Sequence, residues 1–114
     1  MSHLKEPIVL SFTTNTPGTL YELIFPSVTQ FTFNTDFDGS EFYLLGANPG
    51  SEVTYTVKNE ITTNTIGTVV ISTGGVITPT ASSNLTVDVG DVVSIKADTG
   101  GSMGAFGMSL VGER

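Results

Sequence analysis

The stretch from Leu85 to Leu110 constrains the fold of this chain more than any other part of its sequence. Apolar residues there alternate with polar or small ones in three runs, LTVDV from Leu85, VSIKA from Val93 and FGMSL from Phe106. The Gly90-Asp91 pair separates the first two runs, and a glycine-rich loop precedes the third. Alternation with a period of two residues gives each run one buried and one solvent-facing side. The stretch is therefore predicted to form three β-strands that share a core.

Further strands are predicted upstream by the same alternation. They span residues 8–14, 20–25, 30–37, 41–45, 53–57 and 67–72, and residues 74–84 are predicted to form an irregular loop or a short edge strand. Clusters of Gly, Pro, Asn and Asp separate these runs, as is typical of turns. No segment shows a convincing helical pattern. The sequence therefore predicts an all-β fold, a single-domain antiparallel β-sandwich of jelly-roll-like type with eight or nine strands.

The length of the chain, 114 residues, fits one domain. A domain of this size buries roughly 65% of the surface that its unfolded chain exposes, which is enough for a modest core. We predict an N-terminal arm over residues 1–7 and the sandwich domain over residues 8–114. Four phenylalanines close together in the sequence, Phe31, Phe33, Phe37 and Phe42, are expected to form the largest apolar mass of the core.

Charge is the most unusual feature of the composition. Charged residues make up only 13% of the chain, whereas ordinary soluble domains carry about 25%. We therefore expect copies of the chain, or a larger assembly, to cover part of its surface. The net charge is −7, and the four basic residues are scattered along the sequence. Binding to a phosphate backbone needs a clustered positive patch, so we predict that the protein binds neither nucleic acid nor membrane. From the low share of charged residues we predict a homo-oligomer.

Three absences in the sequence bear on where the protein is made. There is no cysteine, so neither disulfides nor thiolate chemistry are available. No segment approaches the ~20 apolar residues of a membrane-spanning helix. The N-terminus lacks the basic region and long apolar core of a signal peptide. We expect a protein that is made and folded in the cytoplasm without secretion.

Catalytic chemistry is not indicated by the residues present. The only histidine, His3, lies in the N-terminal arm, so a nucleophilic triad would have no base. Two carboxylate pairs, Asp36 with Glu41 and Asp88 with Asp91, have the composition that glycoside hydrolysis uses. Aspartates in turns, however, commonly accept hydrogen bonds from nearby backbone N–H groups. We predict no enzyme, no catalytic residue and no cofactor.

The segment DFDGSE over residues 36–41 has two interpretations. The pattern D-x-D-G with a following glutamate resembles a fragment of a calcium loop, in which hard oxygen ligands converge on one cation. An Asp-Gly pair between two alternating runs is also a strong signal for a hairpin. A full calcium loop needs ligands at more positions than this segment offers, so we predict a hairpin and no metal site. Whether Asp36, Asp38 and Glu41 bind calcium stays open.

Two parts of the chain resemble known families. The run LTVDVGDVV from Leu85, followed by AFGMSL from Ala105, resembles the last strands of the complement-globular-head and tumour-necrosis-factor-like jelly rolls. In those domains a Gly-Asp pair precedes a core strand, and an aromatic-Gly-aliphatic strand ends the fold. The chain is also similar to jelly-roll modules of bacteriophage virions, in which a strand such as residues 53–59 leads through a hairpin to a Val/Ile strand and a Val-x-x-Gly-Asp turn. Over residues 53–110, the resemblance implies a trimeric jelly roll with a structural or adhesive role.

Two functions are compatible with this sequence. The first is a virion structural protein, a trimeric capsid decoration (cement) protein that stabilises the particle, binds the major capsid protein and reaches a neighbour with its arm. The lack of a collagen-like stalk or signal peptide favours this virion role over that of the animal extracellular relatives. The alternative is a receptor- or carbohydrate-binding tip module of a phage tail fibre, whose loops over residues 74–84 and 99–104 would contact the ligand.

Exposed aromatic residues in those two loops would favour the binding module, and neither loop contains one. The three tyrosines, Tyr21, Tyr43 and Tyr55, fall within predicted strands. A tyrosine in a strand is more often half-buried in the sheet than free to stack on a sugar. On this basis the structural role is the preferred interpretation.

Overall fold

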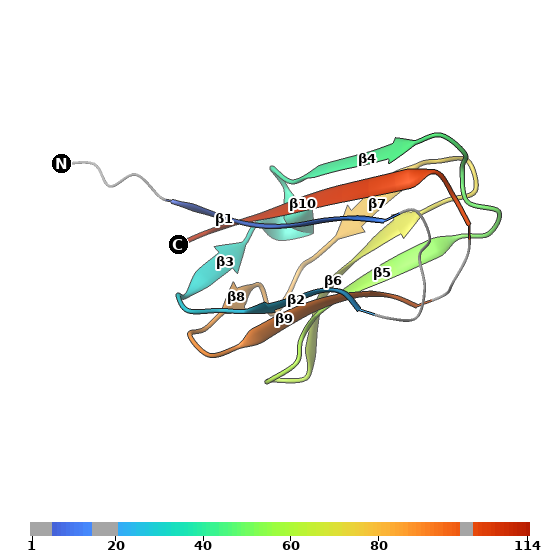
Figure 1. Cartoon of the computed structure of the whole chain (residues 1–114). Helices are drawn as coiled ribbons and strands as arrows, with labels where there is room; N and C mark the ends of the chain where they lie inside the picture. The colour runs from blue at the N-terminus through green and yellow to red at the C-terminus, as the bar shows by residue number, and fades with distance from the viewer. Residues whose placement is uncertain (1–5, 15–20, 99–101) are drawn as a thin grey trace.

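The computed structural model describes residues 6–14, 21–98 and 102–114, and it consists of two antiparallel sheets packed face to face (Figure 1). These residues form ten strands and one short 3-10 turn, whereas eight or nine strands were predicted. The elements are β1 (Pro7–Thr14), β2 (Tyr21–Pro26), β3 (Phe31–Phe33), η1 (Thr35–Phe37), β4 (Glu41–Leu45), β5 (Val53–Asn59), β6 (Asn64–Ile71), β7 (Ile77–Thr80), β8 (Thr86–Val87), β9 (Val92–Ala97) and β10 (Ala105–Glu113).

The strand order identifies the sandwich as jelly-roll-like. The first sheet, sheet A, has the order β1-β10-β3-β8, and β4 also pairs with β10. The second, sheet B, has the order β2-β9-β5-β6-β7. Because β1 lines one edge of β10, the strands β3 and β4 lie end to end along its other edge, like one interrupted strand. With β7 as an added edge strand, this order corresponds to the two Greek keys of a jelly roll, which confirms the predicted fold class.

The alternation that predicted the last three strands is largely confirmed. The inward residues of β9 and β10 are almost completely inaccessible, among them Val93, Ile95, Phe106 and Leu110. The first run is shorter than predicted, because β8 ends at Val87 and the chain then turns toward sheet B. Val89, expected to be buried, lies in that turn and is 67% exposed.

The predicted strand over residues 30–37 forms only as β3, with Phe31 and Phe33 buried as expected, and the predicted hairpin at Asp38-Gly39 is wrong. The strand ends at Phe33, and Asp36 and Phe37 then adopt positive φ angles of 55° and 54° within η1. Gly39, with a φ of 88°, completes the detour. As a result the chain does not reverse but continues along the same edge of β10 as β4.

The predicted phenylalanine cluster forms with three of its four members. Phe31 makes edge-to-face contacts with Phe25 and Phe33, and Phe33 makes another with Phe37, at centroid distances of 5.2–6.0 Å. Phe42 is only half-buried and lies outside this chain of rings. A second aromatic group is formed by Phe12, Tyr55 and Phe106, in which Tyr55 stacks on Phe106 at 5.6 Å.

The two flanks of the sandwich, where the edges of its sheets face each other, differ in structure. On the flank between β8 and β7, here called the closed flank, η1 bridges the two sheets. Asp36 N donates to the Ala81 carbonyl at 2.7 Å, Ala81 N donates to the Asp36 carboxylate at 2.9 Å, and Phe37 is buried.

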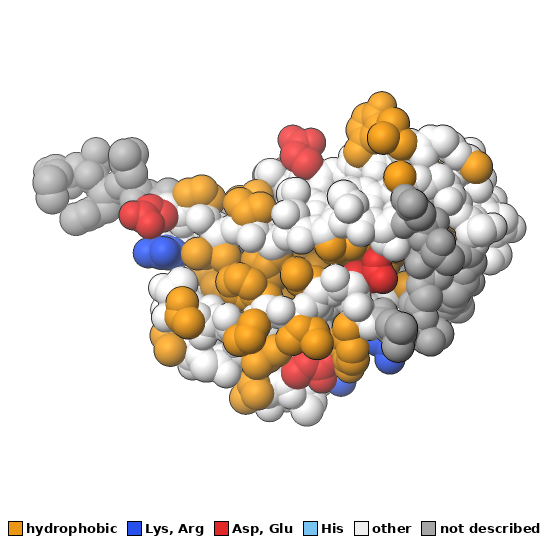
Figure 2. Space-filling model, in the orientation of Figure 1, with side chains coloured by type: hydrophobic (Ala, Val, Ile, Leu, Met, Phe, Trp, Pro, Cys, Tyr) orange, Lys and Arg blue, Asp and Glu red, His pale blue; other side chains and the backbone are white. Residues whose placement is uncertain are grey.

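The opposite flank, between β1 and β2, is here called the open flank. Its core side chains Ile8, Phe12, Leu23 and Phe25 are only half-buried. Figure 2 shows an apolar band across this face, over the region where Figure 1 draws β1 and β2. In the described ranges no helical turn lies across this flank, so the sandwich leaves part of its own core accessible there.

Candidate functional site

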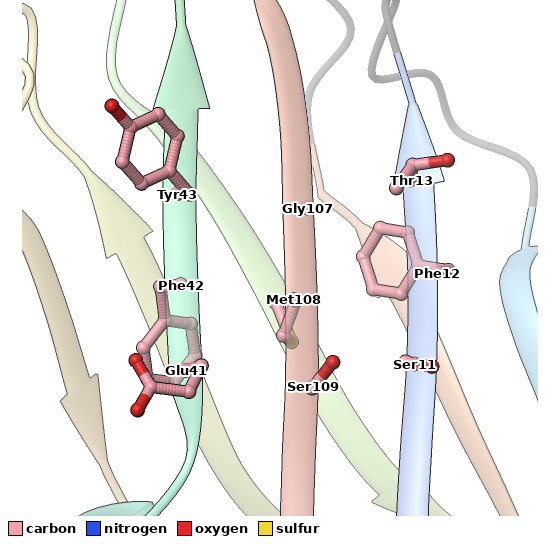
Figure 3. Close-up of a pocket in the computed structure, with 9 residues that line it drawn as sticks. All are labelled: Ser11, Phe12, Thr13, Glu41, Phe42, Tyr43, Gly107, Met108 and Ser109. Atoms are coloured by element: carbon pink, nitrogen blue, oxygen red, sulfur yellow. The ribbon is translucent and has the colours of Figure 1, made fainter.

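An open hollow of about 600 Å³ lies on the outer face of sheet A, centred on β10 between β4 and β1 (Figure 3). The strand register places two rows of residues across it, Thr13-Gly107-Tyr43 and Ser11-Ser109-Glu41. All six occupy outward positions of their strands, as the alternation requires. We call this feature the sheet A hollow.

The hollow exists because β10 has small residues on its outward side. Gly107 has no side chain and Ser109 a short one, so the floor is formed largely by the backbone of β10. Tyr43, which is 67% exposed, stands on the β4 side, and Thr13 stands on the β1 side. Figure 3 shows the Ser109 hydroxyl pointing from β10 toward β1.

The lining of the hollow is mixed in character and almost uncharged, with Phe12, Phe42 and Met108 beside its hydroxyl groups. Its hydroxyl groups come from Ser11, Thr13, Tyr43 and Ser109, and each of them both donates and accepts hydrogen bonds. Glu41 contributes the single charged side chain of the lining. A site of this kind can bind a neutral polar molecule, whereas an anion would meet the carboxylate with no cation to compensate it.

The tyrosines of the chain occupy three different environments. Tyr55 is fully buried in the core, and burial, with a smaller effect of the Glu22 charge, raises the pKa of its phenol. Tyr21 is on sheet B, where Lys96 Nζ lies 5.1 Å from its ring and its hydroxyl donates to Glu60 at 3.4 Å. Only Tyr43 presents an open ring, so the expectation of a half-buried tyrosine was wrong for it.

The carboxylates singled out by the sequence mostly hold loops. The Asp36 carboxylate accepts from Ala81 N, and the Asp88 carboxylate accepts from Gln30 Nε2 at 2.7 Å. The Asp91 carboxylate accepts from Asn59 Nδ2 at 2.9 Å and from Asp88 N at 3.0 Å. These bonds, the first of them above all, lower the pKa of Asp91. Among the five carboxylates that the sequence singled out, Asp38 included, only Glu41 lies at the hollow.

The Gly-Asp pair of the family resemblance has a structural role here. Asn59, which lies just beyond the predicted strand over residues 53–57, is the buried last residue of β5, and its side-chain oxygen accepts from Ile61 N at 3.1 Å. Through the Asn59 amide, Asp91 joins the turn before β9 to the turn after β5. Gly90, with a φ of 89°, donates its N–H to the Ser27 carbonyl at 2.9 Å. This bond connects the turn before β9 to the turn after β2.

No metal centre is formed by the part of the chain that the structure describes, where His, Cys, Asp and Glu side chains nowhere gather in threes. His3 and residues 99–101 of the predicted ligand loop lie outside the described residues. The other predicted loop, over residues 74–84, contains β7. No helix in the described ranges has the length and apolar character to cross a membrane.

The sequence alone did not locate the hollow, because β4 is apolar on both sides. Phe42 and Leu44 point inward, while Tyr43 and Leu45 point outward. Because both faces of β4 are apolar, alternation could not show whether Tyr43 faces the core or the solvent. A usable signal was the FGMSL run of β10, where small residues occupy the outward positions. No protein-family model, no curated protein and no solved structure matches the chain, so the hollow and the flanks are interpreted on their physical chemistry alone.

Proposed function

We propose that the chain is a structural protein of a virion, a capsid decoration protein whose trimers bind the major capsid protein and stabilise the particle. The observation that carries the proposal is the open flank. The described residues of a single copy leave a long edge strand and part of the core uncovered there, and the assembled protein would cover them.

After Pro7 at its first position, the edge strand β1 lacks the features by which proteins usually protect a sheet edge. Elsewhere those features are present: β7 contains Pro79, β8 has only two residues, and β2 has a register shift at Glu22 and ends at Pro26. Residues 8–13 of β1 contain neither charge nor proline, and they pair in one unbroken register with β10. An edge of this kind favours contact with another chain.

Apolar surface extends from the open flank along β2 and onto the adjoining turns. Ile24 is 59% exposed, and Val28 and Val89, in turns joined by the Gly90–Ser27 hydrogen bond, are also exposed. Contiguous apolar surface on a small domain commonly marks an interaction site. The low charge of the whole chain and its jelly-roll strand order also support assembly. The resemblance to trimeric jelly rolls implies that the assembly has three copies.

The solution mass tests this proposal. We expect a particle of about three times 11.9 kDa by light scattering or native mass spectrometry. Ile24→Lys should shift the mass toward the monomer, because a charge in an apolar interface must be desolvated. Val76→Lys is the matched control, since Val76 is 63% exposed before β7, away from the open flank.

Binding to the particle is the second part of the test. Purified capsids should bind the intact trimer and become more resistant to heat, and the Ile24→Lys variant should bind more weakly. A wild-type protein that stays monomeric at micromolar concentration and does not bind capsids contradicts the proposal.

A second candidate function is the receptor- or carbohydrate-binding tip module of a tail fibre. The specific observation that favours it is the sheet A hollow beside the open ring of Tyr43. The test is binding of the purified protein to the surface of host bacteria, which a decoration protein does not require.

A further inference from the structure

We infer that the sheet A hollow binds a neutral sugar ring, with Tyr43 as its stacking surface and Glu41 as its main hydrogen-bond acceptor. The inference rests on the second candidate function and names its ligand class. Four observations support it: the state of Tyr43, the shape of the floor, the polar groups around it and the charge of the lining.

Tyr43 has its ring free for a ligand. Among the described residues it makes no hydrogen bond and no ring contact, and 67% of its surface is exposed. Tyr21, the other exposed tyrosine, has Lys96 against its ring and Glu60 at its hydroxyl. Aromatic rings combine a large apolar face with a polar group, and this suits the mixed apolar and hydroxylated surface of a sugar.

Gly107 provides space on the β10 side of Tyr43, whose ring projects outward from β4 (Figure 3). It lies between Tyr43 and Thr13 in the same row, so the backbones of β4 and β1 are two interstrand spacings apart there, about 10 Å in all. A single sugar ring fits over the backbone of β10 next to Tyr43. Gly107 has no positive φ, and a Cβ there would lie 3.4 Å from Thr13 Cγ2 and 3.9 Å from the Phe12 carbonyl oxygen, so the fold does not demand glycine.

The second row supplies polar partners to such a ring. Glu41 and Ser11 lie on either side of Ser109, and all three are at the hollow. A carboxylate accepts hydrogen bonds from sugar hydroxyl groups, and these charge-assisted bonds are stronger than those between neutral groups. The serine hydroxyls donate or accept according to the hydroxyl they meet.

The charge of the lining selects a neutral sugar. Glu41 is its one charged residue, no lysine or arginine of the described chain lines the hollow, and the chain as a whole carries a net charge of −7. Sialylated, sulfated or phosphorylated sugars would be repelled. A volume of about 600 Å³ lies within the usual range of small-molecule sites, but the hollow is open, so the binding is expected to be weak and to depend on several copies acting together.

The experiment measures binding of the full chain to immobilised neutral hexose oligosaccharides and to their sialylated counterparts. We expect binding to neutral sugars only. Tyr43→Ala should weaken it by about tenfold or more, because the stacking surface is lost. Tyr21→Ala is the matched control on the other sheet and should leave the affinity unchanged. Equal binding by wild type and Tyr43→Ala, or a preference for sialylated sugars, overturns the inference.

Two further variants separate binding from folding. Gly107→Val should fold, with an unchanged melting temperature, and should abolish binding because its side chain occupies the floor. Glu41→Gln keeps the shape and removes the charge, and should weaken binding to neutral sugars severalfold. If Tyr43→Ala changes the solution mass but not sugar binding, the hollow is a contact between copies and the inference is overturned.

Periodate treatment of the host cells distinguishes this inference from the function on which it rests, because periodate cleaves the vicinal diols of sugars. Binding to host cells that is lost after periodate supports both. Binding that survives periodate leaves the receptor-binding function standing and overturns the sugar inference. A protein that binds neither cells nor sugars overturns both.

Discussion

The closed flank and the open flank differ in how far their apolar side chains are covered. Each lies where the edges of the two sheets meet, and each has apolar side chains to cover. On the closed flank the chain uses its own residues, since η1 inserts Phe37 between the sheets and Asp36 bonds to Ala81 on both its backbone and its side chain. On the open flank the side chains of β1 and β2 remain half-buried. The difference shows which side of the sandwich is complete in one copy and which side an assembly would complete.

Truncation of one phenylalanine on each flank gives the largest expected effect. Phe37→Ala should cost about 3–5 kcal/mol, because its ring is 1% exposed and packs edge-to-face on Phe33. Phe12→Ala should cost less, about 1–3 kcal/mol, because its ring is half-buried. Urea unfolding at low protein concentration measures both.

Protein concentration sharpens this comparison. If a second copy covers the open flank, the cost of Phe12→Ala should rise with concentration, while that of Phe37→Ala should depend on it less. Equal costs for the two variants in the monomer would show that the flanks are equally buried, contrary to the structure.

Glycine substitutions test how tightly the closed flank is packed. A Cβ on Gly67 would clash with the Thr80 carbonyl oxygen and come within 2.7 Å of the Phe37 ring and 2.8 Å of Ala81. Gly67→Ala should therefore destabilise the fold by about 1–3 kcal/mol.

Gly50→Ala is the matched control for this substitution. Nothing lies within 4 Å of a Cβ at Gly50, so its cost should stay within about 0.5 kcal/mol. A harmless Gly67→Ala would mean that η1 moves away easily, and the closed flank would then be less rigid than its hydrogen bonds imply.

The strands were predictable because each has one face in the core. The alternation in β9 and β10 specified the inward residues Val93, Ile95, Phe106 and Leu110 without any knowledge of their partners. β4 was predicted with its observed bounds, and the fold class followed from the number and spacing of such runs. Local alternation carries this information because it depends only on the pleat of the strand.

The connections were not predictable in the same way, because they depend on partners distant in sequence. Asp38-Gly39 has the composition of a hairpin turn. The chain makes a detour there instead, because Asp36 bonds to Ala81, which is 45 residues away in the sequence. The predicted strand over residues 53–57 stops short of Asn59, which belongs to β5 and bonds to Asp91. The hollow has the same origin, since Tyr43 and Gly107 become neighbours only through the register of β4 and β10.

Acid should weaken the sandwich near β2 and the turn after it through two carboxylates, Glu60 and Asp91. The bond from Ser94, with smaller contributions from Lys58 and Tyr21 of β2, lowers the pKa of Glu60. Hydrogen bonds from Asn59 and from the Asp88 backbone lower the pKa of Asp91, whose carbonyl accepts from Ser27 N. Both pKa values are lower in the folded than in the unfolded state, so their stabilisation is present at neutral pH and is lost as the pH falls below about 4.

Unfolding by urea at pH 7 and at pH 3 checks this expectation. Ser94→Ala should reduce the loss of stability between the two pH values, because it removes the main cause of the Glu60 shift. The matched control is Ser72→Ala, whose hydroxyl accepts from Val76 N and involves no carboxylate. If wild-type stability does not change between these pH values, neither carboxylate contributes as described.

The smallest expected effect concerns the Tyr55 hydroxyl, which is buried with no hydrogen-bond partner. Its ring stacks on Phe106 and contacts Phe12 of the open flank, so removing the oxygen keeps the aromatic packing. Tyr55→Phe should leave the free energy of unfolding unchanged or raise it by up to about 1 kcal/mol, because an unpaired buried hydroxyl costs stability. Tyr43→Phe, at the surface, is the control and should change it by less than about 0.5 kcal/mol. A clear loss in Tyr55→Phe would instead mean that the hydroxyl is hydrogen-bonded in solution, as it would be if water entered the core through the open flank.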